Sequence, residues 1–126
     1  MPGKARWGQV WWGDLGHDEN KRVVVVSENG WNEIFPSVLA VRLSASPRRD
    51  PGPGFPLVSE RPRVIAICGE VTSLHEQQLI EQAGALTPRQ MRAIAIGLLE
   101  VTQIHRVLGI VHPEVAERIG GRQRRR

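Results

Sequence analysis

The sequence predicts a mainly β protein, a small barrel of about five strands, followed by a helical C-terminal region. Short runs rich in valine, isoleucine and tryptophan, separated by turn residues, fill the first 71 residues. Capping motifs and helical periodicity begin only beyond them. With 126 residues, the chain has the size of one domain that buries a single core.

Each predicted strand is a short apolar run between turn residues. The first occupies residues 8–15, GQVWWGDL, and the second contains four consecutive valines after Lys21 and Arg22. Asn-Gly and Pro mark turns within the segment SENGWNEIFPS, residues 27–37. The remaining strands are predicted at 37–44, 57–60 and 63–71, with a proline-rich surface loop at 45–56.

Two helices are predicted, each from a capping box in which Ser or Thr precedes Glu or Gln by three residues. The first begins near residue 74, after Ser73, and the second near residue 88, where Pro88 takes a favoured first position. Pro113 is expected to open a last short helix. The long helix is expected to lay one apolar stripe on the barrel, made of Ile94, Ala95, Leu98, Val101 and Leu108.

Composition bounds the possible functions. The net charge of +4 is compatible with a polyanionic partner such as RNA. Much of this charge lies in a terminal arginine cluster, which is more often a solvated end: Arg122, Arg124, Arg125 and Arg126. No segment reaches the roughly 18 apolar residues that a membrane span needs, so we expect a cytoplasmic protein without a membrane partner.

The residue inventory argues against several kinds of site. The single cysteine, Cys68, rules out an intramolecular disulfide and is read as a small buried apolar residue. The histidines are scattered singly, so that no zinc-ligand spacing exists and neither a metal nor another cofactor is expected. Gly-rich phosphate loops and a Gly-x-Ser-x-Gly nucleophile motif are absent from the sequence.

The remaining candidates for chemistry are Arg22, at the mouth of the valine strand, and Ser44, at the end of the third strand. In a small barrel both side chains can face one cleft. A guanidinium stabilises the charge of a pentacoordinate phosphorus, and a neighbouring hydroxyl donates to the same oxygens. RNA supplies its own nucleophile, the 2′-hydroxyl, so such a site needs no metal. Alternatively, the arginine only carries its head group to water.

Four patches in the same order and at similar spacing resemble the MazF/PemK family of toxin–antitoxin ribonucleases, from about residue 6 to residue 104. GQVWWGDL resembles that family's first strand, and RVVVVS resembles its second, in which proline usually follows the arginine. VLAVRLS and VIAICGEVTSL are similar to its third and last strands. The patches lie at residues 8–15, 22–27, 38–44 and 64–74, and are continued at 79 and 84–88.

The resemblance implies an SH3-like barrel of the MazF/PemK/CcdB kind that forms a homodimer. It implies a metal-independent endoribonuclease toxin that cuts single-stranded messenger RNA at specific sequences, leaving 2′,3′-cyclic phosphate and 5′-hydroxyl ends, and so inhibits translation and growth. A separate MazE-like antitoxin would neutralise it. By position, Arg22 would be the catalytic arginine and Ser44 its partner hydroxyl. The resemblance supports a barrel with its terminal helix at 1–106, and an extension at 107–126.

The chain departs from the family pattern at several positions. Val23 replaces the usual proline, Gln9 replaces an acidic residue, and the loop at 16–21 is short. Thr72 stands where the family often has an arginine that contacts RNA. The threonine can make a single hydrogen bond there, or it can simply pack.

Other residues are candidates for RNA binding. Trp31, expected in a turn, can stack on a base or serve as a packing contact. Arg48 and Arg49, in the proline-rich loop, can clamp phosphates as a flap or remain solvated.

Three residues near Arg22 complete the predicted site. Lys21 is a neighbouring cation that water can solvate, and Glu19 either orients Arg22 or faces water. His17 titrates near neutrality and can act as a general acid, although loop histidines are usually just exposed.

Two alternatives remain open at the level of sequence. A toxin resembling the CcdB-type gyrase inhibitors would act by binding and would not require Arg22 or Ser44. A non-cleaving RNA-binding module would hold RNA through phosphate contacts and leave it intact.

Overall fold

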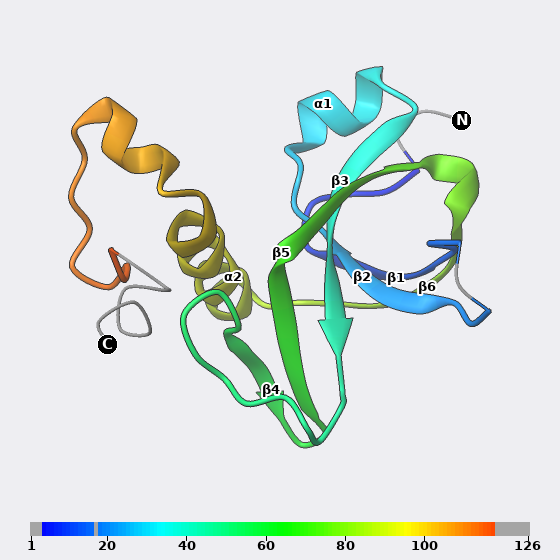
Figure 1. Ribbon diagram of the computed structural model, residues 1–126. Coiled ribbons are helices and arrows are strands. Elements are labelled where there is room, and N and C mark those ends of the chain that lie inside the picture. Colours follow the sequence, from blue (N-terminus) through cyan, green and yellow to red (C-terminus); the bar gives the residue numbers. More distant parts are fainter. Residues whose placement is uncertain (1–3, 17, 118–126) are drawn as a thin grey trace.

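The computed structural model describes residues 4–16 and 18–117, in which six antiparallel strands form one curled sheet (Figure 1). The strand order is β4-β5-β3-β2-β1-β6. The strands are β1 (Gln9–Gly13), β2 (Lys21–Val25), β3 (Ser37–Ser44), β4 (Leu57–Glu60), β5 (Arg63–His75) and β6 (Leu79–Ala85). The helices are α1 (Asn29–Ile34), α2 (Pro88–Thr102) and the 3-10 turns η1 (Glu76–Gln78) and η2 (Ile104–Leu108).

A bulge in β5 bends the sheet into a half-barrel. Val41 of β3 pairs with Val71, but the next residue, Arg42, pairs with Ile67, so residues 68–70 of β5 have no partner on β3. Extra residues in one strand bend it and increase its twist. The bent strand leads through η1 into β6, which pairs with β1 and closes the curl (Figure 1).

Both faces of the central strands are buried. The outer face lies under α2, where Val24, Val41 and Leu43 pack with Met91 and Ile94. The inner face lines the curl, and its apolar residues on β1 to β3 pack with Leu74 of β5 and Leu79 of β6: Trp11, Val23, Val25, Val38 and Ala40. This two-sided burial explains the run of valines, because alternate side chains enter different cores.

Most of the predicted elements are confirmed. The strand predicted at 37–44 is β3, the LVSE run is β4, and the segment at 45–56 contains no strand or helix. The capping box predicted at the start of the long helix is also present. Thr87 accepts a hydrogen bond from the backbone of Gln90, and the Gln90 side chain accepts one from the Thr87 backbone.

The helix predicted near residue 74 is wrong. Instead, β5 continues to His75, and a capping box between His75 and Gln78 begins the short turn η1. A sixth strand follows, because pairing with the distant strand β1 outweighs the local helix signal. The segment at 27–37 is also more than a turn, since it contains helix α1, whose buried Asn32 amide donates to the backbone carbonyl of Ser27.

The predicted apolar stripe of the long helix is only partly correct. Met91, Ile94 and Gly97 are the buried residues of α2, whereas Ala95 and Val101 are exposed. The helix ends before Gln103, which has a left-handed backbone conformation with φ of 55° and so breaks the periodicity. Leu108 therefore falls in η2 and is exposed, and Pro113 lies in a turn rather than opening a helix.

No helix within the described ranges has both the length and the apolar character that crossing a membrane requires. The predicted boundary between residues 1–106 and 107–126 stays a prediction. The terminal arginines lie outside the described residues.

Close packing at Gly97 gives a test of the outer core. A Cβ at this position would lie 2.6 Å from Cys68 Sγ and 2.9 Å from Pro56 Cδ. We expect Gly97→Ala to destabilise the protein by about 1 kcal/mol, because overpacking outweighs the gain in helix propensity. Urea unfolding measures the change. In a Cys68→Ala background the loss should shrink, and an increase in stability with Gly97→Ala alone would contradict this packing.

Candidate nucleic-acid interface

Arg22 and Ser44 lie at the same end of two adjacent antiparallel strands, β2 and β3. Alternation directs Arg22 to the outer face, with Val24, whereas Ser44 follows the outer-face residue Leu43 and is directed to the inner face. Among the described residues no hydrogen bond joins the two side chains. The structure therefore brings the predicted pair to the same end of two central strands, but on opposite faces of the sheet.

Arg22 is half-buried and lies beside an aromatic ring. Its guanidinium carbon is 5.8 Å from the ring centroid of Trp12, its cross-strand partner on β1. Such a contact holds the cation in place without neutralising it. In the part of the chain that the structure describes, Arg22 makes no ion pair, so its charge remains available to an anion.

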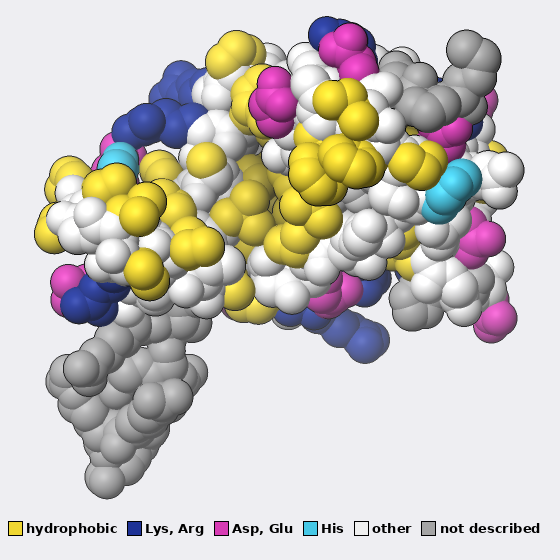
Figure 2. Space-filling model, turned by 90° about the horizontal axis from the view of Figure 1, so that it is seen from above, with side chains coloured by type: hydrophobic (Ala, Val, Ile, Leu, Met, Phe, Trp, Pro, Cys, Tyr) yellow, Lys and Arg dark blue, Asp and Glu magenta, His cyan; other side chains and the backbone are white. Residues whose placement is uncertain are grey.

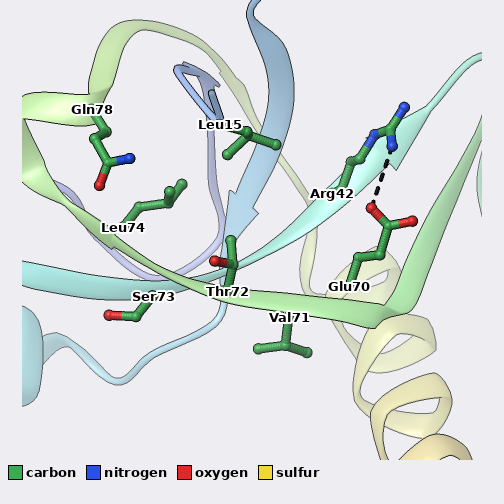
Figure 3. Close-up of a pocket in the computed structure, with 8 residues that line it drawn as sticks. All are labelled: Leu15, Arg42, Glu70, Val71, Thr72, Ser73, Leu74 and Gln78. Carbon is green, nitrogen blue, oxygen red and sulfur yellow. Dashed lines mark hydrogen bonds and ion pairs between the residues drawn. The ribbon is translucent and has the colours of Figure 1, made fainter. Parts of the chain in front are cut away.

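A second group of polar side chains occupies the inner face. Val23 pairs with Arg42, so Arg42 shares its face with Lys21, two residues before Val23, and with Ser44. Lys21 Nζ lies 3.7 Å from Glu19 Oε1, and Arg42 Nη1 lies 3.3 Å from Glu70 Oε1 (Figure 3). The Glu19 carboxylate thus pairs with Lys21, a partner that the sequence did not indicate.

Two cavities meet at Arg42. One, of about 270 Å³, runs along β5, and the other, of about 490 Å³, is lined also by Asp18, Glu19 and Lys21. Figure 3 shows the first cavity with Arg42 and Glu70 at one end, Leu74 and Gln78 at the other, and Leu15 over its middle. The half-buried Thr72 lies between these ends. Thr72 therefore lines a cavity that a ligand can enter, and its predicted contact with RNA stays a prediction.

Arg42 was not identified as a site residue from the sequence, although its spacing from Ser44 could have indicated it. It lies two residues before Ser44 in the same strand, and residues two apart share a face. Its partner Glu70 is 28 residues further along the chain, so only the pairing of β3 with β5 brings the two together.

Arg48 and Arg49 lie in an ordered loop beside a separate cavity of about 320 Å³. Arg49 packs over the Phe55 ring, at 5.2 Å from its centroid. Ser44 Oγ accepts a hydrogen bond from the Ser46 backbone, and Arg63 donates to the Arg49 carbonyl, so the loop is fixed at two points. Both arginines remain exposed to solvent.

Trp31 lies apart from this group. Trp31 lies in α1 and not in a turn, and its ring stacks on Phe35 with a centroid distance of 4.1 Å. This contact favours the packing interpretation. His17 lies outside the described residues.

Cys68 has no chemical role in this geometry. Burial in the outer core, and secondarily the nearby Glu100, raises the pKa of its thiol from 9.0 to about 12. The thiol donates weakly to the Ile94 carbonyl, with Sγ and O 3.7 Å apart. Within residues 4–16 and 18–117, no three His, Cys, Asp or Glu side chains are grouped so as to hold a metal ion.

Comparison with known proteins assigns the family. A model of the PemK-like, MazF-like toxins of type II toxin–antitoxin systems matches residues 6–102. The chain belongs to this family. The MazF/PemK resemblance and the barrel with a C-terminal helix, both predicted from the sequence, are confirmed. No curated protein sequence gave a match.

Solved structures of MazF-like proteins share the fold. A mycobacterial endoribonuclease in complex with its cognate antitoxin is 25% identical, with a TM-score of 0.67 over 90% of this chain and 100% of that chain. A second mycobacterial endoribonuclease is 27% identical, with a TM-score of 0.60 over 86% of this chain and 95% of that one. MazF in a MazE–MazF structure from Deinococcus radiodurans is 14% identical, with a TM-score of 0.65 over 85% and 97%, and shows the fold alone.

The raised pKa of Cys68 predicts an unreactive thiol. We expect iodoacetamide to leave the native protein unlabelled at pH 9, because the thiolate is the nucleophile and burial disfavours it. In urea, where the pKa returns to its ordinary range, labelling at the same pH should be rapid. Mass spectrometry measures both rates, and fast labelling of the native protein would contradict the burial described here.

Proposed function

We propose that the protein is a toxin that cleaves single-stranded messenger RNA at specific sequences without a metal ion, and that a cognate antitoxin neutralises it. The observation that carries the proposal is the family match over residues 6–102. The likeness to an endoribonuclease bound to its antitoxin, over that protein's full length, supports both the activity and the partner.

In the proposed reaction the RNA supplies the nucleophile. The 2′-oxygen forms a bond to the adjacent phosphorus while the bond to the 5′-oxygen of the next nucleotide breaks. The 2′-hydroxyl proton leaves, and the departing 5′-oxygen takes up a proton. The products are a 2′,3′-cyclic phosphate and a 5′-hydroxyl end.

Arg22 and Ser44 would act on the scissile phosphate. Arg22 would neutralise the phosphorane, since its high proton affinity makes it a poor general base. Ser44 would donate a hydrogen bond to the same group. Because the two side chains leave the sheet from opposite faces, the scissile phosphate would lie at the strand ends, where β2 begins and β3 ends. The Arg22 side chain would leave the Trp12 ring and turn around the end of β2 to reach it.

A second copy of the chain is the other proposed partner. Figure 2 shows hydrophobic side chains gathered over two regions of one face. On α1, the residue after it and β3, the exposed residues are Trp31, Ile34, Phe35 and Leu39, and after α2 they are Ile104, Val107, Leu108, Ile110 and Val111. Exposed apolar surface gathered in this way usually marks an interface. We refer to these residues as the apolar face.

Cleavage in EDTA tests the function. The purified protein should cut a long single-stranded RNA at discrete sites, mapped as 5′ ends by primer extension. Arg22→Ala should reduce the rate by roughly 100-fold or more, since it removes a charge that stabilises the transition state. Ser44→Ala should reduce it roughly ten-fold, the effect of one hydrogen bond to a charged group. Arg89→Ala, in the exposed first turn of α2, is the matched control.

Each other outcome has a defined meaning. Intact RNA with a folded parent protein would refute the ribonuclease and favour a binding poison of the gyrase-inhibitor kind. Tight RNA binding without cuts would favour a non-cleaving RNA-binding module. Parent-like cleavage by Arg22→Ala would leave the function but remove the catalytic assignment of Arg22.

The oligomeric state tests the apolar face. Ile34 and Val107 are 71% and 83% exposed, so neither is needed to hold the monomer together. We expect Ile34→Asp and Val107→Asp to weaken the dimer about 100-fold, because a symmetric interface contains each change twice. Analytical ultracentrifugation measures this. Ile80→Asp, on β6, is the control, and a parent that is monomeric at high concentration would refute the homodimer.

A further inference from the structure

We propose that Arg42, positioned by Glu70, binds a backbone phosphate of the RNA and that Lys21 shares this subsite. The inference rests on the proposed ribonuclease function and deepens it. It places a phosphate contact on the inner face of the sheet, in addition to the one proposed for Arg22.

The register of the strands groups these residues. Arg42 pairs with Val23, and Lys21 lies two residues before Val23 on β2, so both cations extend from one face. Both also line the larger cavity. Two cations on adjacent strands match the charge and the oxygens of a phosphodiester.

Most hydrogen-bonding capacity of Arg42 is unused. Of its five donors, the ion pair with Glu70 uses one at Nη1. Its Nε is buried and, within the described residues, has no hydrogen-bond partner. A buried donor without a partner is unfavourable, and a small rotation toward a phosphate oxygen would satisfy it. The guanidinium is thus held in place but incompletely bonded.

The exposure of the two ion pairs also indicates that a phosphate can replace the carboxylates beside Lys21 and Arg42. The side chains of Lys21 and Arg42 are 29% and 28% exposed, whereas their partners Glu19 and Glu70 are 82% and 50% exposed. The carboxylates can therefore turn to water when a phosphate arrives, while the cations stay in place. Glu70 positions Arg42 in the free protein and competes with RNA for it.

Room for the neighbouring nucleotides lies on both sides of Arg42. The cavity along β5 and the cavity beside Lys21 share Arg42 as a lining residue. A phosphate bound at this residue would leave one flanking nucleotide in each cavity. Thr72 would then face the nucleotide that enters the cavity along β5.

This arrangement predicts opposite effects for the two members of one ion pair. Neutralising Arg42 removes a phosphate contact and weakens RNA binding. Neutralising Glu70 removes the competing carboxylate and strengthens it. An ion pair that only stabilises the fold would instead respond with the same sign to the loss of either member.

The experiment measures binding of a single-stranded RNA that is 2′-O-methylated throughout and so cannot be cut, by fluorescence anisotropy over a series of salt concentrations. Arg42→Gln should weaken binding roughly ten-fold, the effect of losing a charge-assisted hydrogen bond. Its slope of log K against log salt should fall by about 0.7, the value for one phosphate contact on a single strand. Glu70→Gln should tighten binding roughly two- to five-fold, the range of a partly exposed ion pair.

Arg92→Gln and Glu114→Gln are the matched controls, because these residues form an arginine–glutamate ion pair on α2 and the segment after it. Both should bind RNA like the parent. Changes in RNA affinity of the same sign for Arg42→Gln and Glu70→Gln, or a parent-like salt slope with Arg42→Gln, would overturn the subsite. RNA cleavage by the parent would then still support the proposed function. A parent that neither binds nor cuts RNA would overturn both. If Arg42→Gln does not fold, as judged by thermal melting, Glu70→Gln alone decides. Tighter RNA binding by Glu70→Gln would support the subsite, and unchanged or weaker binding would overturn it.

Discussion

Burial of the central strands from both sides is the constraint on which the rest of the structure depends. Val23, Val24 and Val25 are 0% exposed, because α2 covers one face of β2 and the curled sheet encloses the other. Charged side chains are excluded from the middle of these strands, where they would lose hydration without a partner. They remain possible only at the strand ends. The cations of the candidate site therefore lie near the end of the central strands where β2 begins and β3 ends.

Strand alternation then divides these cations between two environments. Arg22 lies on the outer face beside Trp12, and Arg42 lies on the inner face beside Glu70. The Trp12 ring holds Arg22 and leaves its charge intact, whereas the Glu70 carboxylate holds Arg42 and can be displaced by a phosphate. A single RNA strand that passes the ends of β2 and β3 would contact both arginines.

The segment after α2 shows how an exposed apolar surface can be held rigidly. The Gln103 side chain donates to the Ala116 carbonyl at 2.7 Å, and the Ala116 backbone donates to Glu100 at 3.2 Å. His105 and Val115 are buried, so the chain folds back on the helix end. The apolar residues between them are thereby presented to solvent on a fixed backbone, which limits the entropy lost when a partner covers them.

The sequence by itself determined the elements whose signals are local: the valine strand, the strand at 37–44, the proline-rich loop, and the Thr87–Gln90 start of α2. It also determined the family, since four patches kept their order and spacing. It did not reveal β6, in which Leu79 alone is buried, so that no alternating pattern marks the strand. Only the tertiary structure decided that Arg22 and Ser44 leave opposite faces and that Arg42 meets Glu70. Both facts depend on the register between strands distant in sequence, which no local propensity encodes.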